Sequence, residues 1–532
     1  MQDRGSRLLG PSGGARQQVR VAAVSDQHPG PSARGSQIIL TIDVGTSSVR
    51  AMLFDDTATP IPDMEVQRMH QMTSTPDGGV ETDARELFDR VATCIDDLLE
   101  RAGSLVQHIA AVAPTTFWHS LIGVSAHGDP VTPVLTWADT RAAGAANELR
   151  GEMDQSAVHA RTGCRIHATY WPAKIRWLQS GSRRRKRGQP KTVRWLSFAE
   201  YVTLRVFGSP RCSISMASAT GLLDQHRCRW DAAMLRAVPI EAGMLSELDD
   251  TPCTGMVPEF AGRWPALANV PWFPGWGDGA TSNVGSGCVT KQQIAVMVGT
   301  SAAMRAVWPA KRIAIPHELW CYRVDSARVV MGGALSEGGN LVDWLRATLR
   351  LPDEPGAAEK LIADMLPDES GLTVLPFLAG ERSPGWHADA RATFSGLSLH
   401  TSAAQIYRAG HEAIAYRFAL VYAALRREVR GVSRVIASGG GILHSPTWMQ
   451  MMADVLNVPV TASAASEASS RGAALLALEA IGAIPNIDAI VAPVGSTFTP
   501  DAARSRKYRR AAERQYALYD QLIGPDVQEP SR

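Results

Sequence analysis

Two copies of one four-residue segment carry groups suited to binding phosphate. The segment Val44-Gly45-Thr46-Ser47 recurs unchanged as Val298-Gly299-Thr300-Ser301. An apolar run precedes each copy and another follows it, at 49–54 and 304–308, which is typical of strand, tight turn, strand. Such a turn exposes backbone N–H groups and hydroxyls that together suit phosphate oxygens. We therefore expect two hairpins to hold a triphosphate from both sides, through Gly45, Thr46, Ser47, Gly299 and Thr300.

One carboxylate distinguishes the two copies. Asp43 stands two residues before the first glycine, where the second copy has Met297. A carboxylate that is kept in only one copy fits a single Mg²⁺ ion or its water shell. The alternative is a polar residue at a strand end that caps the turn. We expect Asp43 to serve the metal, because it adjoins a duplicated phosphate-binding turn.

A second carboxylate, Asp278, lies in the glycine-rich segment 276–287. It comes just before a stretch of small residues that could begin a helix, so it is either an N-cap or a base in a crevice between the halves. Phosphoryl transfer to an alcohol needs neutralised phosphates and a carboxylate that accepts the hydroxyl proton. Asp278 is the candidate for that base.

A third segment is an apolar strand at 435–437 followed by Gly439, Gly440 and Gly441 and then a helical run at 448–456. This order brings backbone close to a flat or phosphorylated ligand. It is not a GxGxxG pattern, and no acid follows at the distance that ribose binding requires. A glycine-rich turn without a ligand is the alternative.

Polar residues near predicted strand ends of the first half could contact a sugar. His119 follows Trp118 and could bind a hydroxyl, although a buried histidine with internal hydrogen bonds is the alternative. Asp139 and Arg141 could contribute too, or could simply pair with each other. Their spacing does not decide between these interpretations.

The elements that must position these residues alternate between strands and helices. Buried strands are predicted at 38–42 and 49–54 and at the β-like runs 109–113 and 120–124, with helices at 83–101 and 139–150. This alternation favours an α/β architecture, and the repeated turn favours two related halves that meet near 285–295. A charged, amphipathic helix is expected at 501–521, packed on a domain surface.

Composition excludes several classes of protein. The chain has 532 residues, with 54 Lys and Arg against 52 Asp and Glu, so no strong field for nucleic acid or anionic lipid is expected. Seven scattered cysteines without a CxxC pair fit a reducing cytoplasm. Residues 1–36 lack a secretory signal and are predicted to form a disordered leader. The basic run Arg183–Arg187 is interpreted as a solvated loop; a nucleic-acid patch is the alternative.

These segments, in this order, resemble the FGGY carbohydrate kinase family over about residues 39–480. Residues 42–50 look like the first phosphate motif, 276–287 the catalytic-Asp motif, 297–305 the second phosphate motif and 438–454 the adenosine motif. Residues 172–178 and 394–412 are similar to the two family signature stretches. Two positions depart from the family pattern. Ala302 stands where a glycine is usual, and Trp118 stands where a methionine is usual, which leaves the shape of the sugar pocket open.

The resemblance implies two ribonuclease-H-like domains of the actin-like ATPase fold with a cleft between them. It divides the chain into the leader at 1–36, an N-terminal domain at 37–290, a C-terminal domain at 291–485 and a tail at 486–532. ATP and Mg²⁺ are the implied cofactors. Asp278 would be the base, Asp43 would place Mg²⁺, Trp118 and His119 would contact substrate, and Gly339 with Gly439–Gly441 would line the adenosine.

The segments 119–121, 137–141, 319–323 and 380–391 look more like gluconate kinases than like other members. D-Gluconate, giving 6-phospho-D-gluconate, is therefore the expected reaction; a xylulose kinase or another pentulose or polyol kinase is the alternative. An arginine should meet the gluconate carboxylate, but the sequence does not indicate which. A catalytically silent ATP-binding regulatory module is the non-enzyme alternative. The expected partner is this small molecule, without nucleic acid or membrane, and a homodimer is the assembly to test.

Overall fold

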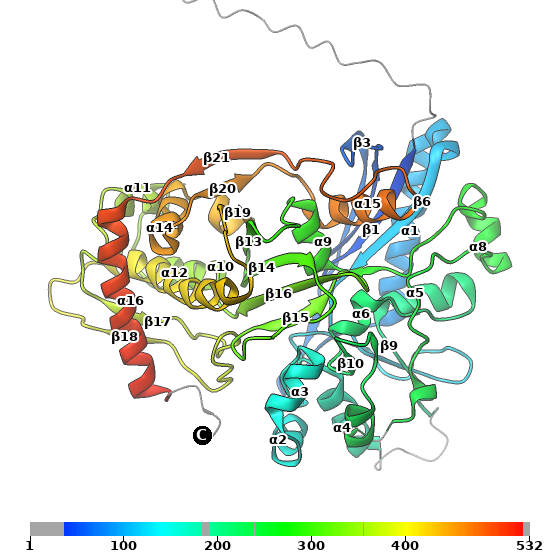
Figure 1. Cartoon of the computed structure of the whole chain (residues 1–532), viewed down its shortest axis with the longest axis horizontal. Helices are drawn as coiled ribbons and strands as arrows, with labels where there is room; N and C mark the ends of the chain where they lie inside the picture. The colour runs from blue at the N-terminus through cyan, green and yellow to red at the C-terminus, as the bar shows by residue number, and fades with distance from the viewer. Residues whose placement is uncertain (1–36, 183–190, 239, 355, 525–532) are drawn as a thin grey trace, which may run out of the picture. The chain divides into compact units, whose positions relative to one another are not determined.

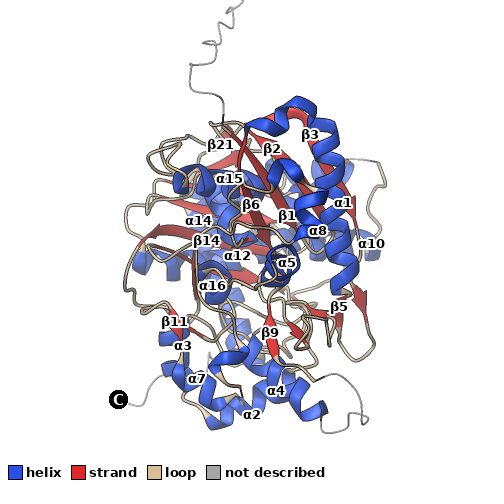
Figure 2. Ribbon diagram, turned by 90° about the vertical axis from the view of Figure 1, so that its right-hand side faces the viewer, coloured by secondary structure: helices blue, strands red, loops and turns tan. Residues whose placement is uncertain are grey.

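The computed structural model describes residues 37–182, 191–238, 240–354 and 356–524. Two mixed β-sheets and the helices on their faces make up most of this part of the chain (Figure 1). The predicted leader and the basic run Arg183–Arg187 lie outside the described residues. Figure 2 shows helices in front of and behind the strands, as an α/β architecture requires.

The first sheet contains the first of the duplicated turns. Its strand order is β12-β6-β1-β2-β3, in which β1, β2 and β3 are antiparallel neighbours and β6 and β12 run parallel to β1. The strands are β1 (Ile38–Val44), β2 (Ser48–Phe54), β3 (Pro60–Met69), β6 (Ile109–Thr116) and β12 (Trp276–Gly277).

The second sheet repeats this arrangement. Its central order is β16-β14-β13-β19-β20, again with an antiparallel hairpin and third strand on one side and two parallel strands on the other. Two further strands, β15 and β21, flank it. The strands are β13 (Gln293–Val298), β14 (Ala302–Pro309), β15 (Trp320–Arg323), β16 (Arg328–Leu335), β19 (Arg434–Ser438), β20 (Val460–Ser463) and β21 (Val494–Phe498). The prediction of two related α/β halves is confirmed.

Alternation along β1 buries both faces of the first sheet. Ile38, Leu40 and Ile42 pack in the same core as helix α1 (Ala84–Ala102), while Ile39 packs with helix α15 (Ala468–Ala480). Successive strand residues point to opposite faces, so a continuous apolar run needs a helix on each side. Asp83 caps α1 by accepting hydrogen bonds from the backbone of Arg85 and Glu86.

Two helices cross from one half to the other. Helix α15 follows β20 of the second sheet but contacts β1 and β6 of the first, and helix α9 (Asp278–Gly285) follows β12 but contacts β14 (Figure 1). The two helices touch through glycines. A Cβ on Gly285 would lie 1.8 Å from the Ala468 carbonyl oxygen, and one on Gly472 would lie 1.9 Å from that of Thr281. This crossing couples the halves next to the start of α9.

The helices of the second half cover its sheet. Helices α12 (Ala403–Glu428), α14 (Pro446–Leu456) and α16 (Ala502–Leu522) share one core with strands β13 and β14. Helix α16 is the predicted tail helix, and it buries Tyr508 and Tyr519 against this half. The tail is therefore part of the packed structure.

One predicted helix starts later than expected. The run 139–150 becomes helix α2 (Ala143–Glu152), because the Asp139 carboxylate accepts hydrogen bonds from the Val80 backbone and the Arg141 side chain and so holds a turn.

The strand expected at 120–124 is β7 (Ile122–Val124). The other described helices and strands are β4 (Thr73–Ser74), β5 (Val80–Thr82), β8 (Val134–Leu135), α3 (Gln155–Thr162), α4 (Trp171–Ser182), β9 (Arg194–Leu196), α5 (Phe198–Phe207), α6 (Ile214–Ser218), β10 (Leu223–Asp224), β11 (Arg229–Trp230), α7 (Ala232–Ala237), α8 (Pro258–Arg263), α10 (Gly339–Thr348), α11 (Ala357–Ala363), β17 (Thr373–Leu375), β18 (Thr393–Ser395) and α13 (Gly440–Leu443).

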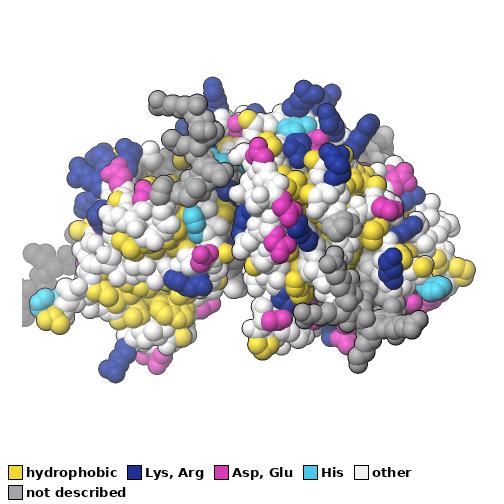
Figure 3. Space-filling model, turned by 90° about the horizontal axis from the view of Figure 1, so that it is seen from below, with side chains coloured by type: hydrophobic (Ala, Val, Ile, Leu, Met, Phe, Trp, Pro, Cys, Tyr) yellow, Lys and Arg dark blue, Asp and Glu magenta, His cyan; other side chains and the backbone are white. Residues whose placement is uncertain are grey.

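One face of the molecule mixes both signs of charge. On the face drawn in Figure 3, Lys and Arg side chains are interspersed with Asp and Glu side chains. Among the described helices, none combines the length and the apolar character needed to cross a bilayer.

Candidate active site

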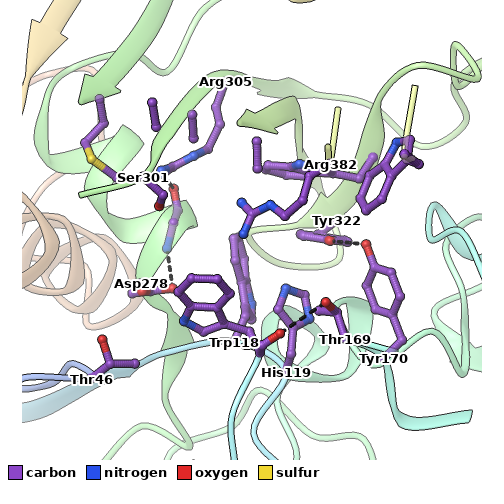
Figure 4. A pocket seen from close by; sticks show the side chains of 18 residues that line it. Thr46, Trp118, His119, Thr169, Tyr170, Asp278, Ser301, Arg305, Tyr322 and Arg382 are labelled. Carbon is purple, nitrogen blue, oxygen red and sulfur yellow. Dashed lines mark hydrogen bonds between the residues drawn. The ribbon is translucent and has the colours of Figure 1, made fainter. Parts of the chain in front are cut away.

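A cavity of about 250 Å³ is lined by residues of both halves (Figure 4). Its volume is below the roughly 300–1,000 Å³ of pockets for drug-sized ligands, so it suits a small molecule. Aromatic rings make up much of its wall. The lining residues are Thr46, Trp118, His119, Trp137, Thr169, Tyr170, Asp278, Gly279, Met297, Ser301, Ala302, Ala303, Arg305, Trp320, Tyr322, Ala334, Arg382 and Trp386.

Asp278 borders this cavity as the first residue of α9. Gly277 holds the N-cap position, so Asp278 is not the N-cap residue. Its carboxylate accepts a hydrogen bond from the first-turn amide of Gly279 at 2.8 Å. Burial raises the pKa of Asp278, whereas the charge of Arg305 and backbone hydrogen bonds lower it. A partly desolvated carboxylate of this kind can accept a proton from a bound hydroxyl.

Asp43 lies at the end of β1, close enough to Asp278 for the two charges to interact. Burial and the charge of Asp278 raise the pKa of Asp43 to about 7, and Arg50 opposes them. Two carboxylates that repel each other in a buried site are a suitable place for a divalent cation. Among the described residues, no group of three or more acidic, His or Cys side chains could hold a metal, so water and a ligand's oxygens would complete its shell.

The Trp118 ring packs against the backbone on both sides of Asp278, at Gly277 and Gly279. A Cβ on Gly277 would lie 1.8 Å from the Trp118 indole nitrogen, and one on Gly279 would lie 2.5 Å from its ring carbon. The indole N–H donates to the Ser215 carbonyl at 3.2 Å. The glycines therefore give the ring room to lie against the start of α9.

His119 also lines the cavity, in the strained left-handed region at φ 67°. Its Nδ1 pairs with the Ala219 carbonyl oxygen at 2.7 Å, and burial lowers its pKa to about 3. The buried side chain of Lys174 donates to the carbonyls of His119 at 3.0 Å and Thr136 at 2.7 Å. His119 is thus a neutral hydrogen-bonding group, fixed by Lys174, whose role the sequence did not indicate.

The two hairpin turns differ in length. Val44 pairs with Val49, whereas Val298 pairs with Ala302, so the first turn holds one residue more. The Gly45 amide donates to the Ser48 carbonyl at 2.9 Å, and the Gly299 amide donates to that of Ser301 at 3.0 Å. Both glycine N–H groups are thus used inside their own turns. Within the described chain, the hydroxyls of Thr46, Ser47, Thr300 and Ser301 have no protein hydrogen-bond partner in the turns.

Three glycine-containing segments meet at the second hairpin. The Gly339 amide donates to the Gly299 carbonyl at 2.7 Å. A Cβ on Gly439 would lie 2.4 Å from the Val298 carbonyl oxygen, and one on Gly441 would lie 3.0 Å from it. Gly440 begins α13 beside them. The structure therefore brings together Gly299, Thr300, Gly339 and Gly439–Gly441, the residues predicted to bind one nucleotide.

Three prominent pocket residues received no individual role from the sequence. Tyr170 and Tyr322 face each other with their hydroxyls 2.7 Å apart, and Arg382 extends toward the middle of the cavity (Figure 4). Tyr322 and Arg382 lie in two of the segments that resemble gluconate kinases, 319–323 and 380–391. The sequence therefore marked these segments but did not indicate what either side chain does. Asp139 and Arg141, in contrast, form an ion pair that Glu81 extends.

Comparison with known proteins defines the class of this fold and site. Residues 38–285 match the N-terminal domain, and residues 294–481 the C-terminal domain, of the FGGY family of carbohydrate kinases. The chain belongs to this family and is a carbohydrate kinase. It is 30% identical over 488 residues to a gluconokinase of Bacillus subtilis (strain 168), covering 88% of this chain and 93% of that protein.

Two solved structures share the fold. A ligand-bound xylulose kinase from Lactobacillus acidophilus has a TM-score of 0.85, and a gluconate kinase from the same species has 0.84. Each is 24% identical, and each comparison covers 92% of this chain and 98% of the other. The likeness establishes the two-half, actin-like architecture.

Proposed function

We propose that the protein transfers the terminal phosphate of Mg-ATP to a primary hydroxyl of a small sugar acid, converting D-gluconate to 6-phospho-D-gluconate. The position of Asp278 supports this proposal most strongly. Its carboxylate borders the aromatic cavity, which Thr46 of the first hairpin and Ser301 of the second also line. An acceptor hydroxyl and a phosphate chain can therefore reach the same place.

In the proposed reaction, Asp278 takes the proton of the acceptor hydroxyl. The hydroxyl oxygen forms a bond to the terminal phosphorus, the bond between that phosphorus and ADP breaks, and ADP leaves with the electron pair. Arg305 favours the ionised form of Asp278, and burial keeps the carboxylate basic. Trp118 and His119 would contact the carbon chain and hydroxyls of the acceptor.

The nucleotide would lie against the second half. Gly299, Thr300, Gly339 and Gly439–Gly441 would hold its phosphates and adenosine, with Thr46 and Ser47 facing them from the first hairpin. Because the Gly45 and Gly299 amides are already used, the threonine and serine hydroxyls would supply much of the hydrogen bonding. Asp43 would help to hold Mg²⁺, which supplies charge neutralisation on the phosphates when bound.

The choice of gluconate is supported by the gluconokinase relative, and the xylulose kinase fold keeps that ketose as the second candidate. We also propose that the domain boundary lies near residue 290, with the C-terminal domain ending near 485. Helix α15 would then belong to the second domain by sequence and to the first by packing.

The experiment that tests this function is coupled ADP release from Mg-ATP across gluconate, xylulose, ribulose, glycerol and erythritol. A preference for gluconate would support the proposal. A preference for xylulose would replace the substrate and keep the chemistry. Nucleotide binding without turnover on any acceptor would favour the silent regulatory module instead.

A further inference from the structure

Arg382 occupies a position in the cavity that the phosphoryl-transfer chemistry does not require. It lies on the connection between β17 and β18, and its guanidinium carbon lies 5.1 Å from the centre of the Trp137 ring. Tyr170 and Tyr322, whose hydroxyls bond to each other, interact with its charge. The arginine is therefore surrounded by rings and extends into the space where an acceptor would bind (Figure 4).

Two acids lie near Arg382, and each accepts a hydrogen bond from another group. Its neighbour Glu381 forms an ion pair with Arg417 and accepts a hydrogen bond from the Tyr519 hydroxyl at 2.6 Å. Glu337 accepts the Ala379 backbone N–H at 2.8 Å and also interacts with the charge of Arg382 without forming an ion pair with it. In the part of the chain that the structure describes, Arg382 makes no ion pair. Arg305, by comparison, donates to the Gly279 carbonyl and interacts with Asp278.

Charges are separated along the cavity. Asp278 and Asp43 lie at the end next to the hairpins, where Arg305 and Arg50 partly balance them. Around Arg382 the ionisable neighbours are Glu337, Tyr170 and Tyr322, together with His119 and His167. Burial and the charges of Arg382 and Lys174 lower the pKa of both histidines. A ligand with a hydroxyl at one end and an anionic group at the other would complement this arrangement.

We propose that Arg382 binds the carboxylate of the acceptor and so selects sugar acids over neutral sugars of the same length. A guanidinium matches a carboxylate through two parallel hydrogen bonds, and its charge is not lost on burial. The inference rests on the proposed kinase function and adds the residue that defines its substrate class. It also explains how a family with neutral-sugar members could accommodate an acid.

The test compares gluconate with its uncharged amide, gluconamide, in the full-length protein and in Arg382→Gln and Arg382→Lys. We expect wild type to prefer gluconate, and Arg382→Gln to lower kcat/KM for gluconate about 10- to 100-fold while kcat/KM for gluconamide changes little. Arg382→Lys should recover part of the preference, because charge returns without the paired geometry. Arg391→Gln, an exposed arginine of the same connection, is the matched control and should behave as wild type.

Calorimetric titration of gluconate separates failure of this inference from failure of the proposed function. If wild type phosphorylates no acceptor but binds gluconate, and Arg382→Gln does not, the kinase function fails and the carboxylate site stands. If wild type turns over gluconamide as well as gluconate, or Arg382→Gln keeps the preference for the acid, the kinase function stands and the role of Arg382 is overturned. If wild type does not bind gluconate, the role of Arg382 is also overturned.

Discussion

Asp43 at the end of β1 and Asp278 at the start of α9 interact through their charges, although β1 is the first strand of the described chain and α9 follows β12, the last strand of the first sheet. β6 lies between β1 and β12 in the sheet and runs parallel to both, so the carboxyl ends of these strands meet at one edge. Ligands of open α/β sheets bind at this edge. The two carboxylates are therefore brought together by sheet order.

Asp278→Asn tests the proposed base. Losing a positioned proton acceptor should lower kcat by about 10²- to 10⁴-fold, and ADP affinity should stay near that of wild type. Coupled ADP release and calorimetry measure the two quantities. Asp353→Asn, at an exposed position, is the control. Turnover by Asp278→Asn close to that of wild type would show that another group accepts the proton.

Proton release on nucleotide binding tests Asp43. Its pKa of about 7 means that the free protein holds this proton at pH 6 and has lost it at pH 8. Mg²⁺ binding should expel the proton, so Mg-ADP affinity should rise between pH 5 and 7 and then level off, with close to one proton released at pH 6. Calorimetry at pH 6 in buffers of different ionisation enthalpy counts that proton.

The same shift has a consequence for stability. A carboxyl whose pKa is raised above its unfolded value of 3.8 favours the folded state only while it is protonated. Asp43 should therefore lower the free energy of unfolding of the metal-free protein as pH rises from about 4 to 7. Asp43→Asn should remove both effects. Equal proton release from Asp43→Asn would assign the proton to another group.

Gly277→Ala tests the contact between Trp118 and the start of α9. The new methyl group would overlap the indole, so the ring must move, at a cost of about 1–3 kcal/mol in the free energy of unfolding and with a higher acceptor KM. Adding Trp118→Met should make room and recover part of both losses. Denaturant unfolding and acceptor kinetics on the single and double variants give the answer. An unaltered Gly277→Ala protein would argue against this packing.

Lys174→Met tests the support beneath His119. The change keeps most of the side-chain volume, but it leaves the His119 carbonyl without its donor and the Thr136 carbonyl with only the Asp139 amide. An unsatisfied buried carbonyl costs about 1–3 kcal/mol, so the melting temperature should fall and the acceptor KM should rise. KM for ATP should stay constant if Lys174 only positions His119. An equal change in both KM values would indicate a general loss of structure.

Tyr519→Phe tests whether α16 helps to hold the segment that carries Arg382. The lost hydroxyl leaves the Glu381 carboxylate with one donor fewer, which should cost about 1–3 kcal/mol and raise KM for gluconate more than KM for ATP. Tyr516→Phe is the matched control, because its hydroxyl donates to the Tyr416 carbonyl on α12 instead. Identical kinetics in the two variants would contradict this role for Tyr519.

The repeated Gly-Thr-Ser turns could be found in the sequence because their chemistry is local. A buried strand, a glycine turn and a second strand occupy a short stretch, and their order predicted both hairpins and the α/β class. Asp43 and Asp278 stood out for the same reason, next to glycine-rich turns. The difference in turn length was not predictable, because it depends on cross-strand pairing.

The tertiary structure decided which distant segments meet. The crossing of α9 and α15 depends on Gly285 and Gly472. Nothing in the sequence around either glycine indicates which helix it will contact. Arg382 was one arginine among many until the fold placed it in an aromatic cavity, where its neighbour Glu381 pairs with Arg417 instead. The sequence by itself determined which residue types and local turns were available. Only long-range packing decided which charges would be left without a partner, because burial and pairing depend on neighbours from elsewhere in the chain.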